Sequence, residues 1–291
     1  MTYQTLTLTR SDGVAVLTLN RPSAANTIND VLAREFMRAA IECDDADDIR
    51  AVVLTGAPPM FCLGGDLKSF VGAGDALKSK LKEITADLHA GISRLTRMNA
   101  PVIAAVNGIA AGAGFSLAMA ADLAIAAQSA SFVMAYTNAG LAPDGSSTFF
   151  MPRRLGDRRA RELMLTNRTL SANDALEWGV VNQVVPDAQL METAMTLARR
   201  LAAGPTRAYG AVKSLLNASF ENGLETQMEL EARAIADMSA TADGREGVAA
   251  FIGKRKPHFT GREGRHDDLD KRTPETVHPS TRPPDGVCRI G

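Results

Sequence analysis

The sequence predicts an α/β protein in which a largely parallel sheet precedes a helical region. Apolar, β-rich segments alternate with segments of helical periodicity up to about residue 155, and Gly- and Pro-rich turns separate them. Beyond that point the pattern is helical. Such alternation is typical of right-handed βαβ units, in which helices cover the faces of a parallel sheet. The chain has 291 residues, of which 45% are hydrophobic, so it can bury a large core.

Each expected element rests on a local signal. Ser11-Asp12-Gly13 is a hairpin turn, Asn26 or Thr27 can cap a helix, and Ser171 with Asp174 forms a capping-box-like start. The expected strands are 5–9, 14–20, 49–55, 121–127 and 131–136. The expected helices are 26–43, 81–98, 147–155, 171–179, about 188–203, 206–218, 221–239 and 243–253.

A Gly/Ala-rich turn and a small-residue helix follow the apolar run PVIAAVNG that starts at Pro101. Gly108, Gly112 and Gly114 let the backbone bend tightly and lie bare of side chains. A helix that begins after such a turn aims free N–H groups at an approaching anion. The turn lacks the GK[ST] of a phosphate-binding loop and the spacing GxGxxG, which favours a small anion such as a carbonyl oxygen.

A second strand-to-helix turn, Phe61-Cys62-Leu63-Gly64-Gly65-Asp66, follows the β-rich run 49–55. Two backbone N–H groups that converge from separate turns form an oxyanion hole, which stabilises an enolate or a tetrahedral intermediate. Each turn taken alone fits an ordinary strand-to-helix connection better, because Gly-rich turns are common. The pair is therefore what indicates an active site.

The two motifs resemble those of the crotonase superfamily of enoyl-CoA hydratases and isomerases. FCLGGDL is similar to its first oxyanion motif, and PVIAAVNGIAAGAGFSLAMAAD is similar to its second. The resemblance runs from about Thr5 to Thr260. It implies that the backbone N–H groups of Leu63 and Ala113 hold the oxygen of a CoA thioester.

The resemblance also implies a domain organisation. Residues 1–200 are expected to form a crotonase-type ββα spiral core for acyl-CoA binding and catalysis. Residues 201–261 are expected to form a C-terminal helical lobe that assembles a homotrimer or a dimer of trimers. Residues 262–291 are rich in Pro and charge, and we expect them to be a disordered tail.

Further residues are implied in CoA binding by the same resemblance. They come from the loop after the second strand, from both glycine motifs and from the end of the lobe: Ala24, Ala25, Asn26, Leu63, Gly64, Gly65, Asp66, Gly112, Ala113, Lys256 and Phe259. Lys256 and Phe259 are expected to reach the nucleotide of a neighbouring subunit. Arg21, Lys68 and Lys254 are candidate phosphate partners, although for each lysine taken alone a solvated surface charge is the favoured interpretation.

The positions that carry two catalytic glutamates in the hydratase branch hold Ser116 and Tyr136 here. A carboxylate occurs instead at Asp144, in GLAPDGSS, which resembles the isomerase branch, where an acid moves a proton between carbons of the acyl chain. The sequence leaves a second interpretation open, because Asp is also a favoured cap for the helix expected at 147–155. The missing glutamates favour the catalytic interpretation.

Two more side chains are candidates for the catalytic group. Tyr136 can hydrogen-bond Asp144 or substrate through its hydroxyl, or it can be a core aromatic at a strand end. His89 lies on the helix that leads to the second motif, where the dehalogenase branch of the superfamily carries a histidine base. A lone helical histidine is more often a surface or lining residue.

The leading hypothesis is an enoyl-CoA isomerase with Asp144 as proton shuttle and Leu63 and Ala113 as the oxyanion hole. One alternative is arylacyl-CoA chemistry similar to that of epoxyphenylacetyl-CoA isomerases or chlorobenzoyl-CoA dehalogenases, with His89 as base. Another is an enoyl-CoA hydratase of low activity. An RNA-binding branch of the superfamily uses a lysine-rich helix, but the corresponding helix here ends in DDADD.

Composition excludes several other classes of protein. The net charge of −1 argues against nucleic-acid and anionic-membrane binding. Three cysteines without CxxC spacing predict a reducing compartment, and we expect a cytoplasmic protein. The apolar run 101–127 is interrupted by Asn107, glycines and Asp122, which argues against a membrane span. The four histidines show no ligand spacing, so we expect no metal and no cofactor other than the coenzyme A of the substrate.

Overall fold

A twisted six-stranded sheet forms the centre of the molecule, in the strand order β1-β2-β3-β4-β6-β9. The structure is a computed structural model, and it describes residues 2–261. The expected tail, 262–291, therefore lies outside the described residues. Only the β1–β2 hairpin is antiparallel, and every other pairing in this sheet is parallel. A second, three-stranded sheet has the order β5-β7-β8. The predicted α/β class with a largely parallel sheet is confirmed.

The strands are β1 (Leu6–Ser11), β2 (Val14–Leu19), β3 (Ala51–Gly56), β4 (Val102–Val106), β5 (Ile109–Ala111), β6 (Leu123–Ala127), β7 (Ser131–Val133), β8 (Leu170–Ser171) and β9 (Gln183–Val185). The α-helices are α1 (Asp30–Asp45), α2 (Leu67–Val71), α3 (Leu77–Arg97), α4 (Ala113–Ala120), α5 (Ser147–Leu155), α6 (Asp157–Thr166), α7 (Ala172–Trp178), α8 (Leu190–Ala202), α9 (Thr206–Ala218), α10 (Leu224–Ser239) and α11 (Ala242–Ile252).

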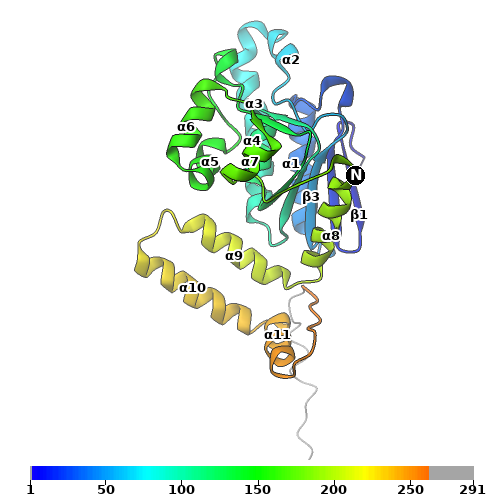
Figure 1. Cartoon of the computed structure of the whole chain (residues 1–291), viewed down its shortest axis with the longest axis vertical. Coiled ribbons are helices and arrows are strands. Elements are labelled where there is room, and N and C mark those ends of the chain that lie inside the picture. The colour runs from blue at the N-terminus through cyan, green and yellow to red at the C-terminus, as the bar shows by residue number, and fades with distance from the viewer. Residues whose placement is uncertain (1, 262–291) are drawn as a thin grey trace, which may run out of the picture.

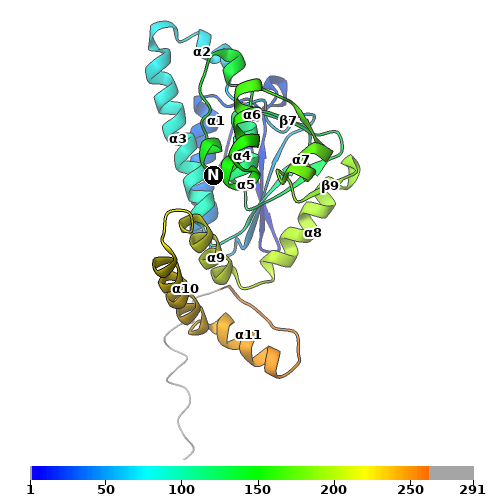
Figure 2. The ribbon, with the colours of Figure 1, turned by 60° about the vertical axis from the view of Figure 1, so that its left-hand side comes forward.

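The core lies between the sheet and the helices on its two sides. Every residue of β3 and β4 is buried, as expected for central parallel strands covered on both faces. Helices α1 and α3 pack together on one side of the sheet, and α8 lies against β2, β3, β4 and β6 on the other side (Figure 2). The short helix α4 is wholly buried, which explains its composition of Ala, Gly and other small or apolar residues.

Several expected boundaries are wrong, and helix α3 begins at Leu77, four residues before its expected start at 81. The cap of α1 is Asn29, whose side chain accepts the N–H of Leu32, so the helix begins later than a cap at Asn26 or Thr27 would place it. The strand expected over 131–136 ends at Val133.

The predicted hairpin turn is confirmed, since Asp12 and Gly13 both have positive φ angles, of 53° and 77°. The capping box of Ser171 and Asp174 is also present.

Helices α9, α10 and α11 form a lobe that extends away from the sheet (Figure 1). Helix α10 is amphipathic, yet none of its residues is buried within the chain. Large apolar side chains of the lobe are exposed: Val212, Leu216, Phe220, Leu224, Met228, Leu230, Ile235, Val248, Phe251 and Ile252. None of the described helices is both long enough and apolar enough to cross a membrane.

Glu35 of α1 fastens the N-terminal strand to the body of the protein. Its carboxylate accepts hydrogen bonds from the backbone N–H groups of Gln4 and Thr5, at 2.8 Å each, and from the Thr5 hydroxyl. Burial alone would raise the pKa of Glu35, but these hydrogen bonds outweigh it and hold the pKa below its ordinary value of 4.5.

We expect Glu35→Gln to lower the free energy of unfolding by about 1–2 kcal/mol at pH 7, because charge-assisted bonds are lost. A carboxyl group with a lowered native pKa stabilises the fold above its ordinary pKa, and the contribution is lost as the pH falls through the native value. Urea unfolding between pH 3 and pH 7 should therefore show a flatter acid dependence for the variant. An unchanged acid dependence would contradict this role.

Candidate active site

The two glycine-rich turns are joined by backbone hydrogen bonds. The N–H of Cys62 donates to the carbonyl of Ile109 at 3.1 Å, and the N–H of Ala111 donates to the carbonyl of Cys62 at 2.9 Å. A Cβ atom at Gly114 would lie 2.1 Å from the Cys62 carbonyl oxygen, so only glycine allows the approach. The turns therefore form one continuous wall, which neither motif reveals by itself.

The two predicted oxyanion-hole donors differ in their hydrogen bonding. Ala113 is the first residue of α4, where a helix supplies its N–H with no acceptor, and within residues 2–261 that N–H forms no hydrogen bond. The N–H of Leu63 donates to the carbonyl of Ala25 at 3.2 Å. A substrate oxygen at this wall would thus find the Ala113 N–H open. At Leu63 it would have to share the N–H with the Ala25 carbonyl, or replace that carbonyl as the acceptor.

An apolar cavity of about 310 Å³ opens beside this wall. Its lining combines both turns, the N-terminal half of α3 and the segment that leads into α5. The lining residues are Ile28, Leu63, Gly64, Gly65, Leu67, Phe70, Leu81, Ile84, Thr85, Leu88, Gly112, Ala113, Ala135, Tyr136, Ala139, Leu141, Ala142 and Asp144. Asp144 is the only carboxylate among these described residues, so any acid–base chemistry by a carboxylate in the cavity depends on it.

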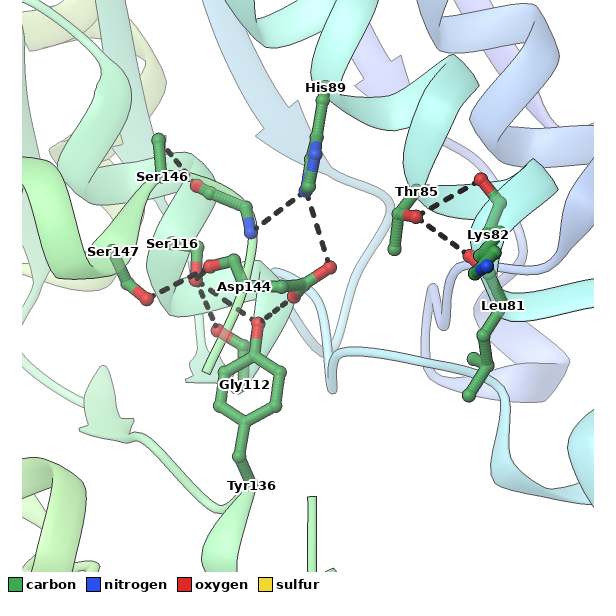
Figure 3. Close-up of polar contacts among 11 residues, drawn as sticks. Leu81, Lys82, Thr85, His89, Gly112, Ser116, Tyr136, Asp144, Ser146 and Ser147 are labelled. Atoms are coloured by element: carbon green, nitrogen blue, oxygen red, sulfur yellow. Dashed lines mark hydrogen bonds and ion pairs between the residues drawn. The ribbon is translucent and has the colours of Figure 1, made fainter. Parts of the chain in front are cut away.

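Asp144, which lines this cavity, lies in a network of hydrogen bonds (Figure 3). The Tyr136 hydroxyl donates to Asp144 Oδ1 at 2.5 Å. The carbonyl of Asp144 accepts from the hydroxyls of Ser116, at 3.0 Å, and of Ser147, at 2.9 Å. The helix-cap interpretation of Asp144 is wrong, because the N-cap residue of α5 is Ser146 and no side chain caps that helix end. The carboxylate instead faces Tyr136 and His89.

Ser116 and Tyr136, which stand where hydratases carry glutamates, contact each other as well as Asp144. Their hydroxyl oxygens are 3.2 Å apart. Burial, followed by the nearby Asp144 charge, raises the pKa of Tyr136 well above its ordinary value of 10.0. Tyr136 therefore keeps its proton at neutral pH and acts as a donor to Asp144. Neither residue can supply the carboxylate base that its position has in a hydratase.

His89 projects from α3 toward the opposite side of the same carboxylate (Figure 3). Its Nε2 lies 3.5 Å from Asp144 Oδ2. The backbone N–H of Gly145 donates to this Nε2 at 3.2 Å, so Nε2 is the hydrogen-bond acceptor of the ring. Gly145 has a φ of +61°, and this left-handed conformation turns its N–H toward the histidine.

Most of the predicted residues before α2 line or support the wall. Ala25 has a left-handed φ of 51° and its carbonyl meets Leu63. Asn26 is fully buried, and its amide group donates to the carbonyls of Ala57 and Met60. The side chain of Asn26 thus supports the loop and does not reach the cavity.

Asp66 and Arg21 are joined by an ion pair of 2.9 Å. Asp66 also caps α2 by accepting the N–H of Ser69. The guanidinium of Arg21 further donates to the carbonyl of Thr27. Both side chains therefore help to hold the first motif in place, and the phosphate contact expected of Arg21 stays a prediction.

Lys256 and Phe259 follow α11 in the chain, and neither lines the cavity. Figure 2 shows α11 at the opposite end of the molecule from α2. Lys256 is exposed, and the Phe259 carbonyl accepts a hydrogen bond from Arg50. A single chain does not bring these two residues to Asp144, and their predicted contact with a neighbouring subunit's nucleotide stays a prediction.

Sequence reasoning missed two features of the site. The apolar stripe of α3 predicts only a core-facing side, but its first three members, Leu81, Ile84 and Leu88, line the cavity together with Thr85. Ala135 adopts a left-handed φ of 56°, just before Tyr136. No residue-type signal announces this conformation, since alanine rarely adopts it.

Comparison with known proteins identifies the family of the chain. Residues 9–262 match the family model of enoyl-CoA hydratase/isomerase, and the chain belongs to that family. A probable enoyl-CoA hydratase of Rhodobacter capsulatus is 41% identical, over 90% of this chain and 100% of that protein. The 1,2-epoxyphenylacetyl-CoA isomerase of Escherichia coli is 42% identical, over 86% and 96%.

The family also includes relatives with a different named reaction. The 4-chlorobenzoyl coenzyme A dehalogenase-1 of an Arthrobacter species is 36% identical, over 88% of both chains. Among solved structures, an enoyl-CoA hydratase from Polaromonas sp. JS666 matches with a TM-score of 0.84 and 33% identity, over 87% of this chain and 99% of that one. The crotonase fold expected from the sequence is thus confirmed, while the relatives do not share one reaction.

Proposed function

We propose that the protein is an enoyl-CoA isomerase that moves a double bond along the acyl chain with Asp144 as proton shuttle. The observation that carries this proposal is that Asp144 is the single carboxylate among the described residues lining an apolar cavity beside two glycine turns. A 1,3-proton shift needs one group that takes a proton from one carbon and returns it to another. One carboxylate suffices for this, whereas a hydratase also has to manage a water molecule.

The proposed reaction begins when the thioester oxygen binds at the N–H groups of Ala113 and Leu63. Asp144 Oδ2 then takes a proton from the carbon next to the thioester, and the electron pair of that C–H bond moves into the enolate, which the two N–H groups stabilise. Tyr136 holds Oδ1 throughout. The enolate collapses as Asp144 returns a proton to the far end of the allylic system, which shifts the double bond. No metal and no cofactor beyond coenzyme A enter this scheme.

The assay that tests the proposal is a panel of 2-enoyl-, 3-enoyl- and arylacetyl-CoA esters, with the position of the product double bond determined by NMR. We expect interconversion of 3-enoyl- and 2-enoyl-CoA. Hydration products without isomerisation, or no turnover of any member of the panel, would overturn the proposal.

We expect hydration of crotonyl-CoA to be slower than isomerisation by about 100-fold or more, because a positioned acid–base group is worth about 100- to 10,000-fold and both glutamate positions lack one. The measurement is the kcat/KM for loss of the enoyl absorbance. Ser116 and Tyr136 are the residues that set this limit. A hydration kcat/KM equal to that for isomerisation would contradict it.

Arylacyl-CoA chemistry is a second candidate, and the position of His89 favours it. The Nε2 of His89 lies 3.5 Å from Asp144 Oδ2, so a base stands beside a carboxylate that could attack a halogenated ring. The named reactions of the Escherichia coli and Arthrobacter relatives are consistent with aromatic substrates. Halide release from 4-chlorobenzoyl-CoA, followed with a halide electrode, would favour this candidate over isomerisation.

We further propose that second copies of the chain cover the lobe, as a trimer or a dimer of trimers. Helix α10 buries none of its residues in the monomer, and it exposes Leu224, Met228 and Ile235. A contiguous apolar surface of this kind is typical of an interface. Light scattering on the purified protein should give a multiple of three chains, and Ile235→Asp should reduce it. A monomer in solution would contradict this proposal.

A further inference from the structure

The two oxygens of the Asp144 carboxylate have different neighbours. Oδ1 accepts the Tyr136 hydroxyl at 2.5 Å. Oδ2 faces His89, and among the described residues His89 is the one titratable group paired with it, at 3.5 Å. Tyr136 keeps its proton, because burial and the Asp144 charge raise its pKa far above neutrality. Of the two groups that touch the carboxylate, only His89 can therefore take a proton from it.

His89 also connects Asp144 with the outside of the protein. The side chain of Asp144 is 28% exposed and belongs to the substrate cavity, so a bound acyl group would cover it. The side chain of His89 is 49% exposed and lines a separate cavity of about 860 Å³, together with Ser93, Arg97 and Glu221. The imidazole thus lies between the Asp144 carboxylate of the substrate cavity and a second cavity, which α3, α5 and α9 line with both polar and apolar side chains.

We infer that His89 carries the proton that Asp144 takes from the substrate out to solvent, so that this proton exchanges with water before the product forms. This inference rests on the proposed isomerase function and adds the fate of the transferred proton. It assigns His89 as a positioning and relay residue that acts through Asp144, without contact to the substrate.

The step balances in atoms and charge. The substrate C–H bond breaks, an O–H bond forms at Oδ2, and the electron pair goes to the enolate. The Oδ2–H bond then breaks as Nε2 takes the proton, which leaves an aspartate and an imidazolium. The distance of 3.5 Å is longer than a hydrogen bond, and such contacts commonly shorten when substrate binds.

The Gly145 N–H gives this relay a release step. It donates to Nε2 only while that nitrogen is unprotonated. Once Nε2 carries a proton, two N–H groups face each other and the hydrogen bond between Gly145 and the ring is lost. The half-exposed imidazolium then gives the proton to water, and a solvent proton returns to Asp144 by the same path.

The test compares isomerisation with proton exchange in wild type and His89→Gln. Glutamine offers an oxygen to the Gly145 N–H, but it cannot take up a proton. With 3-hexenoyl-CoA deuterated at carbon 2, we expect wild type to retain little deuterium at carbon 4 of the product. In the isomerised product that it forms, the variant should retain several-fold more deuterium at carbon 4. Ser93→Ala, one turn further on the same helix and in the same cavity, is the control and should match wild type.

A second readout separates this inference from the proposed function. Hexanoyl-CoA has no double bond to move, yet wild type should exchange its carbon-2 protons in D₂O, measured by mass spectrometry. His89→Gln should lower that exchange by about tenfold or more. Equal exchange in both proteins, or full deuterium retention by wild type, would overturn the relay while leaving the isomerase proposal intact. Absence of any isomerised product would overturn the proposed function, and the relay with it.

Discussion

Asp144→Asn is expected to lower the rate of 3-enoyl-CoA isomerisation by about 100-fold or more, because an amide cannot serve as the base that takes the substrate proton. The variant keeps the shape of the side chain, and its amide oxygen can still accept the Tyr136 hydroxyl. Substrate binding should change little, since the oxyanion turns and the apolar lining are untouched. Steady-state kinetics should thus show a fall in kcat with a nearly constant KM.

The same variant should fold normally. The Asp144 carboxylate does not cap α5, so its loss removes no helix-end hydrogen bond. Thermal unfolding followed by circular dichroism should give a Tm close to that of wild type. Asp157→Asn is a matched control, because it removes a largely exposed carboxylate near the same helix. Equal turnover by Asp144→Asn and wild type would remove Asp144 from the mechanism.

Lys213→Ala is expected to cause the largest loss of stability. Lys213 belongs to α9 of the lobe but is 7% exposed, and its ammonium group donates to the carbonyls of Leu95 and Ala100 at 3.0 Å each. It also pairs with Asp122 at 2.8 Å. Burial lowers the pKa of Lys213 in spite of the neighbouring carboxylate, which shows that its charge is largely removed from water.

Removing one partner of a buried pair costs about 3–5 kcal/mol, because the other charge and its hydrogen-bond acceptors lose their partner. Asp122 is partly exposed, so we expect a value near about 3 kcal/mol, at the lower end of that range. Guanidinium unfolding gives the measurement. Lys78→Ala, an exposed lysine on α3, should cost less than about 0.5 kcal/mol. Similar losses for both variants would contradict the anchoring role of Lys213.

The fold could be predicted where the signals are local or periodic. The alternation of β1 and β2 around Asp12-Gly13, the capping box at Ser171 and the apolar runs of β3 and β4 each dictate an element on their own. The start of α1 shows where such local signals stop being sufficient. Asn26, Thr27 and Asn29 are all good helix caps, and tertiary contacts decide between them, because Asn26 is used to hold the loop at Met60.

The site could be predicted in its parts but not in its connections. The sequence motifs identify both turns, and Asp144 follows from the absence of acids at positions 116 and 136. The hydrogen bond between Leu63 and Ala25 depends on a loop conformation that alanine seldom adopts, so no residue-type rule indicates it. The place of His89 depends on the packing of a whole helix. Its spacing alone could not tell whether the ring faces Asp144 or water.

The hydrogen bonds between the two glycine turns have a consequence for how such an enzyme can change. They join main-chain atoms of Cys62, Ile109 and Ala111, so they survive almost any exchange of the side chains that face the cavity. In the proposed mechanism, thioester recognition is thereby uncoupled from the choice of reaction, which depends on positions 116, 136 and 144. During evolution, substitutions at those positions can change the reaction while the binding of coenzyme A esters is kept. In protein engineering, the backbone of the two turns can therefore be kept, and positions 116, 136 and 144 are the first to vary when a new reaction is sought.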